Sequence, residues 1–200
     1  MSQRDMLTLL GKIKTDFYTA ETKNTFFKNG QKAQCAEQIT SQINIYDLLK
    51  YTVYIIPNTN HVYLDYPLFK QYANANNYEE VVNYVIAVLA QCIQIYGQYE
   101  MHVDLKGFTI TAAERYKSGI QLFCSKCCGQ TETQFATPLK NMYIYNTPSV
   151  IETITRLFAP FMDPIIPKKL VYISKTDSPR LLEELMSTKI SSRECDSSHA

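Results

Sequence analysis

The segment Leu139–Ile173 is predicted to form a strand, a helix and a second strand, and this order constrains the fold most. Residues 142–145 are rich in aromatic and β-branched side chains, and Asn146–Pro148 supplies an N-cap candidate followed by a proline suited to a first helical turn. Apolar residues then recur at the spacing of one helix face until two prolines interrupt them. Residues 170–173 form a short buried-strand pattern. Two strands joined by a helix predict a βαβ unit.

Strand and helix patterns also alternate along the preceding part of the chain. Extended segments are predicted over 52–56, 61–65 and 101–105, and helices over 77–96 and 111–128. A last helix is expected to begin at Ser178. This alternation predicts an α/β domain of three layers, in which a mixed, mostly parallel sheet has helices on both sides.

Composition divides the chain into three predicted regions. Residues 1–45 form a short amino-terminal helical extension, with one helix within 1–20 and a possible second one around 33–43. Residues 46–186 form the α/β domain. The Ser-rich residues 187–200 are predicted to be a disordered tail.

Charge and hydropathy exclude several classes of function. The net charge of +1 argues against a nucleic-acid binder, because phosphate binding depends on many basic side chains. The amino terminus lacks a charged segment followed by an apolar one, so a cytoplasmic setting with reduced thiols is expected. The longest apolar run, 81–96, is short for a membrane span and contains polar residues, which favours a buried helix.

Two groups of residues suggest a metal site or a catalytic site. Cys124 and Cys127 form a CxxC pair, but zinc requires four ligands and no second pair follows, so free thiols and no metal are predicted. His102, Asp104 and Lys106 suggest acid–base chemistry, yet no nucleophile motif, P-loop or dinucleotide fingerprint accompanies them. Asp104 is expected to hold the strand end through backbone hydrogen bonds. We therefore predict no catalytic residue, no cofactor and no enzyme.

Three segments, in this order, resemble the CRAL-TRIO lipid-binding family of phosphatidylinositol and tocopherol transfer proteins. His102–Phe108 contains an Asp-Leu-x-Gly turn, and Tyr143–Pro148 ends a strand with Asn-x-Pro. Leu157–Pro164 ends a helix with Leu-Phe-x-Pro-Phe-hydrophobic-Asp-Pro. The resemblance covers about 52–185, and no single segment is diagnostic by itself.

The resemblance implies an apolar cavity with the sheet as its floor and the helix Ser149–Met162 as a mobile lid. A lipid would contact strand residues Met101, Val103, Tyr143 and Tyr145, and lid residues Val150, Ile154, Leu157, Phe158, Phe161 and Met162. Lys169 stands where phosphatidylinositol-transferring members bind the headgroup phosphate. Thr137 occupies the place of that site's acidic partner, so the resemblance leaves the identity of the lipid open.

Two functions follow from the resemblance. In the first, a cytoplasmic protein, transiently peripheral to membranes, binds a lipid or other hydrophobic small molecule and transfers or presents it. The second is suggested by the reduced amino-terminal helical part and by the lack of the family's Leu-Pro-x-x-x-Gly-Gly segment. These departures resemble compact modules of the family that bind proteins, which would have a filled cavity and a protein partner or a homodimer.

Overall fold

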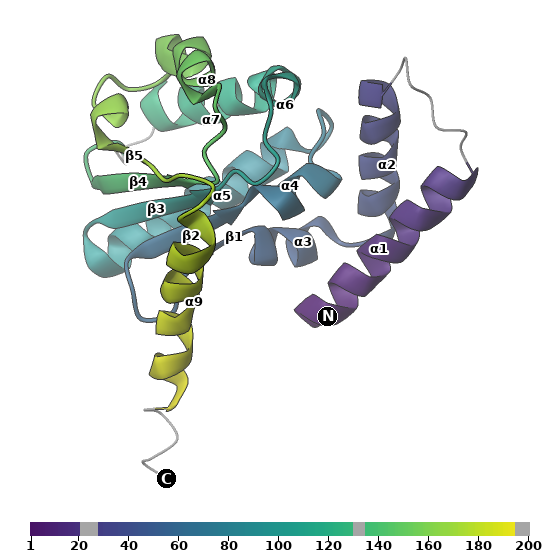
Figure 1. The fold of residues 1–200 in the computed structure, drawn as a ribbon, viewed down its shortest axis with the longest axis horizontal. Coiled ribbons are helices and arrows are strands. Elements are labelled where there is room, and N and C mark those ends of the chain that lie inside the picture. Colours follow the sequence, from purple (N-terminus) through teal and green to yellow (C-terminus); the bar gives the residue numbers. More distant parts are fainter. Residues whose placement is uncertain (21–27, 130–134, 195–200) are drawn as a thin grey trace.

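The computed structural model describes residues 1–20, 28–129 and 135–194, and its centre is a five-stranded sheet (Figure 1). The strands follow the spatial order β1-β2-β3-β4-β5. Their bounds are β1 Val53–Ile55, β2 His61–Asp65, β3 Tyr99–Asp104, β4 Leu139–Tyr145 and β5 Leu170–Tyr172. Strand β1 is antiparallel to β2, and every other neighbouring pair is parallel. This confirms the predicted mixed, mostly parallel sheet.

Helices surround this sheet in the alternating order expected from the sequence. Their bounds are α1 Gln3–Ala20, α2 Lys28–Gln42, α3 Ile45–Thr52, α4 Tyr66–Tyr72, α5 Tyr78–Tyr96, α6 Ile110–Arg115, α7 Lys117–Gly129, α8 Ile151–Phe158 and α9 Ser178–Glu194, with 3-10 turns η1 Ala159–Phe161 and η2 Ile166–Lys169. Helix α9 crosses the face of the sheet opposite α5 (Figure 1). The hydroxyl of Tyr54 on β1 donates to the sulfur of Met186 on α9, 3.7 Å away.

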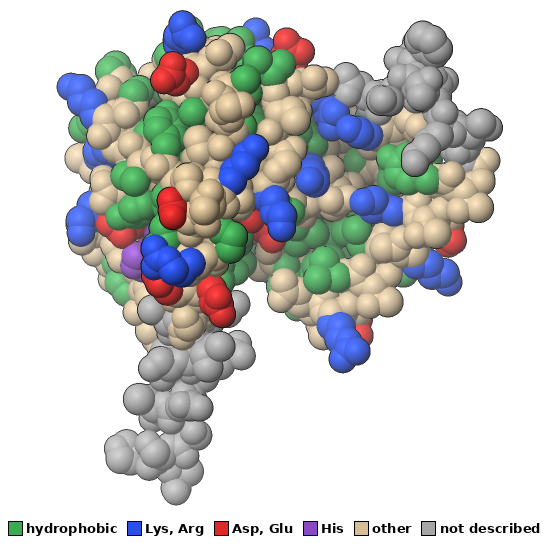
Figure 2. Space-filling view, viewed as in Figure 1, with side chains coloured by type: hydrophobic (Ala, Val, Ile, Leu, Met, Phe, Trp, Pro, Cys, Tyr) green, Lys and Arg blue, Asp and Glu red, His purple; other side chains and the backbone are tan. Residues whose placement is uncertain are grey.

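Helix α5 is the long buried helix that the sequence predicted. Glu79 and Glu80 lie in its first turn, where carboxylates favour the helix dipole. Gly97 ends it with a φ of 74°, a left-handed conformation that glycine adopts without strain. Among the described helices, none is long and apolar enough to cross a membrane. Charged side chains of both signs are interspersed on the face shown in Figure 2.

Two helical predictions are wrong in detail. Helix α3 has no counterpart among the predicted helices, although Asn44 caps it by accepting a hydrogen bond from the amide of Tyr46. The single helix expected over 111–128 is two helices, α6 and α7. They meet at Tyr116, whose backbone (φ −93°, ψ 5°) lies outside the regular helical range.

The lid helix begins later than expected. The sequence placed its start at Asn146–Pro148, but α8 starts at Ile151. Asn146 has a φ of 51°, and Thr147 donates from its amide to the Ile173 carbonyl, 3.1 Å away, and from its hydroxyl to the Ile144 carbonyl, 2.8 Å away. These groups therefore join the ends of β4 and β5 and do not cap a helix.

Both terminal regions are more helical than predicted. The amino-terminal extension contains two full helices, and α1 buries Met6, Leu10, Ile13 and Phe17 in the main hydrophobic core. The disordered tail expected from residue 187 is helical as far as Glu194, and residues 195–200 lie outside the described residues. The Ser187 hydroxyl donates to the Glu183 carbonyl at 2.7 Å within α9, so this serine does not interrupt the helix.

The packing of α1 predicts unequal effects of two adjacent truncations. Met6 is fully buried and Leu7 is 47% exposed. We expect Met6→Ala to lower the free energy of unfolding by about 2–5 kcal/mol, because it leaves a core cavity. Leu7→Ala should change this free energy by less than about 0.5 kcal/mol. Urea denaturation of both variants measures the difference, and equal effects would show that α1 does not pack on the domain.

Candidate functional site

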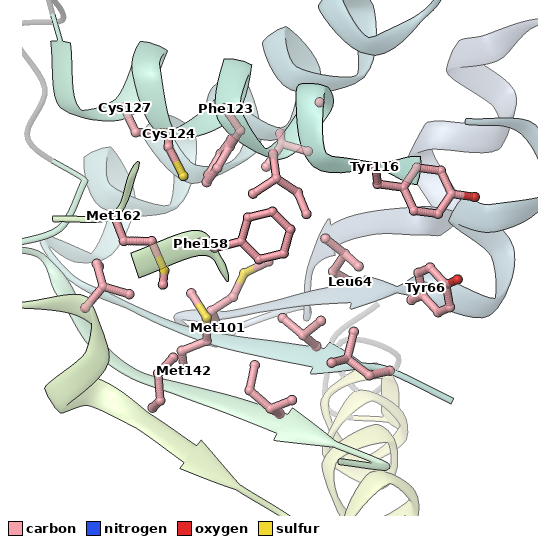
Figure 3. Close-up of a pocket in the computed structure, with 18 of the residues that line it drawn as sticks. Leu64, Tyr66, Met101, Tyr116, Phe123, Cys124, Cys127, Met142, Phe158 and Met162 are labelled. Atoms are coloured by element: carbon pink, nitrogen blue, oxygen red, sulfur yellow. The ribbon is translucent and has the colours of Figure 1, made fainter. Parts of the chain in front are cut away.

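An apolar cavity of about 380 Å³ lies between the sheet and helices α5, α7 and α8 (Figure 3). Its floor consists of side chains that point to one face of the strands. Parallel pairing aligns Leu64 of β2 with Val103 of β3, and Met101 of β3 with Met142 of β4. Because side chains alternate along a strand, these residues share one face of the sheet. The floor residues are Leu64, Met101, Val103, Met142, Ile144 and Leu170.

Helices supply the walls and the roof of the cavity. Figure 3 shows Phe123, Cys124 and Cys127 of α7 on the side opposite Met101 and Met142, with Phe158 of α8 between them. Helix α5 contributes a further apolar wall. Its lining residues are Val81, Val82, Val85 and Leu89.

Two of the lining tyrosines have their hydroxyls in hydrogen bonds to backbone carbonyls. Tyr99 donates its hydroxyl to the Phe135 carbonyl at 2.9 Å, and Tyr78 donates to the Arg115 carbonyl at 3.2 Å. Burial raises the pKa of Tyr78 to about 12 and also raises the pKa of Tyr99, so both hydroxyls stay neutral at physiological pH. The interior therefore suits an apolar molecule and offers few groups to a polar one.

Helix α8 is attached through a small cluster separate from the main core. Ile154 and Phe158 are buried against Ala113 of α6. On the side of the sheet edge, the hydroxyls of Thr155 and Tyr172 are hydrogen-bonded at 3.0 Å, which ties α8 to β5. Further half-buried apolar side chains complete this cluster, so the roof of the cavity has a packing core of its own.

Five of the residues predicted to contact a lipid line this cavity: Met101, Val103, Ile154, Phe158 and Met162. Three other predicted residues do not. Leu157 and Phe161 are half-buried beside the α8 cluster, and Val150 is 38% exposed. The helix begins after Val150, so the predicted apolar face extended too far towards the amino end.

Tyr143 and Tyr145 were also predicted to contact the lipid, but they lie on the opposite face of the sheet. They alternate with Met142 and Ile144, which face the cavity. The Tyr143 ring stacks on His102 with centroids 4.8 Å apart, and the Tyr145 hydroxyl is hydrogen-bonded to Nδ1 of His102 at 2.9 Å. Burial, together with neighbouring His61, lowers the pKa of His102 to about 4.

The lining residues of α5 and α7 are absent from the predicted site. A signal for α5 exists in the sequence, because apolar residues occupy most of its circumference, which indicates burial on more than one side. Among the described residues, Cys35, Cys92, Cys124 and Cys127 are in no disulfide; the Cys128 side chain and Cys195 are outside the described part.

Asp104 has the structural role expected for it. Its Oδ1 accepts hydrogen bonds from the Lys106 amide at 2.9 Å and from Nδ2 of Asn146 at 2.7 Å. These two bonds join the turn after β3 to the turn after β4. The Asp-Leu-x-Gly and Asn-x-Pro segments that define the resemblance are therefore in direct contact.

Lys169, the predicted headgroup ligand, points to backbone carbonyls. Its ammonium donates to the carbonyl oxygens of Ala136 at 2.9 Å, Thr137 at 3.2 Å and Leu139. Ala136 and Leu139 also line the cavity. In this arrangement Lys169 holds the segment that leads into β4, two residues of which line the cavity.

Comparisons with known proteins agree with this architecture. The model of the CRAL/TRIO domain family matches residues 46–194. A crystal structure of Sfh5 superposes with a TM-score of 0.53 at 17% sequence identity, over 86% of this chain. The chain spans 65% of the length of that structure. No curated protein sequence matches the chain.

The contacts of Lys169 predict a structural effect when its charge is removed. Lys169→Met leaves the three carbonyls without their donor, so we expect the free energy of unfolding to fall by about 1–3 kcal/mol. Lys168→Met, at the exposed neighbouring lysine, should change it by less than about 0.5 kcal/mol. Urea denaturation compares the two variants. If Lys169→Met is as stable as the wild type, the three hydrogen bonds contribute no stability. The ammonium of Lys169 in the wild type would then be available to bind a headgroup.

Proposed function

The chain belongs to the CRAL/TRIO domain family, a family of lipid-binding domains, and we propose that it binds one hydrophobic molecule beneath α8. The observation that carries the proposal is the apolar cavity of about 380 Å³ over the sheet. Small-molecule sites typically measure about 300–1,000 Å³ and are lined mainly by apolar side chains. The cavity has both properties.

The chemistry of the lining indicates the class of the bound molecule. The lining side chains are nearly all apolar. Each methylene removed from water contributes about 0.8 kcal/mol, so burial of an alkyl chain in this space is favourable. The cavity therefore suits a hydrophobic molecule.

We infer that α8 is the lid through which the molecule enters. Ile154 and Phe158 line the cavity from this eight-residue helix, which is followed by the turns η1 and η2. The contacts that hold α8 belong to the cluster around Ala113, which is separate from the main core, and to the hydroxyl pair of Thr155 and Tyr172. Releasing them exposes the cavity without disturbing the main core, and such openings commonly limit the rate of ligand exchange.

Transient contact with a membrane surface is the step that would deliver the lipid. Exposed apolar side chains gather near the edge strand and the ends of the lid segment: Val150, Ile165, Val171 and Tyr172. The bonds from Thr147 to Ile173 and from Thr155 to Tyr172 hold the lid segment beside β5. Apolar side chains around an opening insert readily into a bilayer interface.

The alternative, a module that binds proteins and has a filled cavity, requires bulky side chains above the sheet. Met101, Val103 and Met142 instead leave a space beneath Phe158 (Figure 3). This space favours ligand binding over the filled alternative. A cavity lined by apolar groups also lowers stability unless a ligand occupies it.

A charge introduced into the cavity lining tests whether the ligand binds there. Phe158→Asp places a carboxylate against the bound chain, so we expect affinity for a fluorescent fatty acid to fall at least about 100-fold. Thr153→Asp adds the same charge to the exposed side of α8 and should leave affinity within about twofold. Circular dichroism verifies that both variants fold. Equal uptake by the folded Phe158→Asp variant would show that the ligand does not lie beneath α8.

Membrane contact predicts a position-dependent loss of vesicle binding. Ile165→Glu should weaken binding to phosphatidylcholine vesicles by about tenfold, since a buried isoleucine contributes about 1.5–3 kcal/mol. Leu7→Glu introduces the same charge at an exposed apolar site on the distant helix α1 and should have no effect (Figure 1). Vesicle sedimentation measures both variants. If the two weaken binding equally, the edge near β5 is not the membrane-contacting surface.

A further inference from the structure

Three side chains with metal-binding atoms converge on the outer face of the sheet, opposite the cavity. His61 begins β2, and Glu100 and His102 belong to β3. Parallel pairing places His61 beside Glu100, and alternation along β3 directs His102 to the same face. One ligand atom from each residue lies within 4.8 Å of the other two. This grouping arises from the strand register and is separate from the proposed lipid site.

The ligand atoms are close to the spacing that a tetrahedral metal ion requires. Nδ1 of His61 lies 2.7 Å from Nε2 of His102 and 3.6 Å from Oε2 of Glu100. Ligands about 2.0–2.1 Å from zinc are roughly 3.3 Å apart in a tetrahedral site. The His61 side chain is 29% exposed and starts its strand, so a small ring movement is sufficient.

Neighbouring side chains orient two of the three candidate ligands. Nδ1 of His102 is bonded to the Tyr145 hydroxyl, which leaves Nε2 directed at His61. Nδ2 of Asn141 donates to Oε1 of Glu100 at 3.2 Å, which leaves Oε2 towards His61. Metal-binding histidines in proteins are commonly oriented by such a partner on the second ring nitrogen.

Access to the group is open on one side. The His61 side chain is 29% exposed, whereas His102 is buried. The ammonium of Lys140 lies 3.7 Å from Oε1 of Glu100, but 59% of this side chain is exposed. Lys140 thus faces the carboxylate oxygen that is not directed at His61, and it is free to turn into solvent.

We propose that His61, Glu100 and His102 bind a divalent transition-metal ion such as Zn²⁺, with water completing the coordination. Two imidazoles and one carboxylate suit zinc and its neighbours in the first transition series. Binding requires His61 as the tautomer protonated on Nε2 and His102 as the tautomer protonated on Nδ1, so that Nδ1 of His61 and Nε2 of His102 both bind from neutral imidazoles. The ion joins β2 to β3 directly behind Met101 and Val103, and therefore stabilises the cavity floor.

Titration of the full chain with Zn²⁺, followed by calorimetry, tests this site. We expect one equivalent to bind and the thermal unfolding midpoint to rise. His61→Ala and Glu100→Gln should each weaken binding at least about tenfold. Glu114→Gln, which neutralises an exposed carboxylate on α6, should bind as the wild type does.

Cobalt distinguishes this site from the cysteines of the chain. Co²⁺ bound by two histidines and a carboxylate gives visible ligand-field bands without the intense thiolate charge-transfer band of cysteine ligands. The proposal predicts the former spectrum and its loss in His61→Ala. It is overturned if the wild type binds no Zn²⁺, if both ligand variants bind it unchanged, or if the cobalt spectrum shows thiolate ligation.

Discussion

The alternation of side chains along β3 determines which residues line the cavity and which face outwards. This strand has parallel neighbours on both sides, so its register fixes the faces of β2 and β4. Tyr99, Met101 and Val103 face the cavity, whereas Glu100, His102 and Asp104 face outwards. A shift of one residue would exchange the two sets and place charges in the cavity. The six residues of β3 therefore place the apolar cavity on one face of the sheet and the polar side chains on the other.

The sequence predicted the architecture well because its strongest signals are local. Period-two and helical patterns located β2, α5 and the order of the βαβ unit. The Asp-Leu-x-Gly and Asn-x-Pro motifs indicated the CRAL/TRIO domain family, whose model matches the chain. The errors lie where tertiary contacts override local preference. Asn146 and Thr147 resemble a helix start, yet their hydrogen bonds join two strand ends. Helix α1 has an ordinary amphipathic pattern that does not reveal how deeply Met6 is buried.

The site was harder to predict than the fold, since it depends on which face a buried strand turns to the helices. Both sets of alternating residues in β4 are large, so Tyr143 and Tyr145 were assigned to the cavity in place of Met142 and Ile144. The walls from α5 and α7 come from distant parts of the chain. The cluster of His61, Glu100 and His102 has no motif spacing, because His61 precedes Tyr99, the first residue of β3, by 38 positions in the sequence.

An apolar space of this size lowers the stability of the protein when it is empty. A hydrophobic molecule that fills the space offsets this loss of stability. We infer that such a molecule occupies the space beneath α8. Organic extraction of the freshly purified protein, followed by mass spectrometry, tests this inference. We expect a hydrophobic or amphiphilic compound in about one-to-one ratio with the protein, absent from a Phe158→Asp preparation. Equal amounts of the same compounds from both preparations, or none from either, would contradict it.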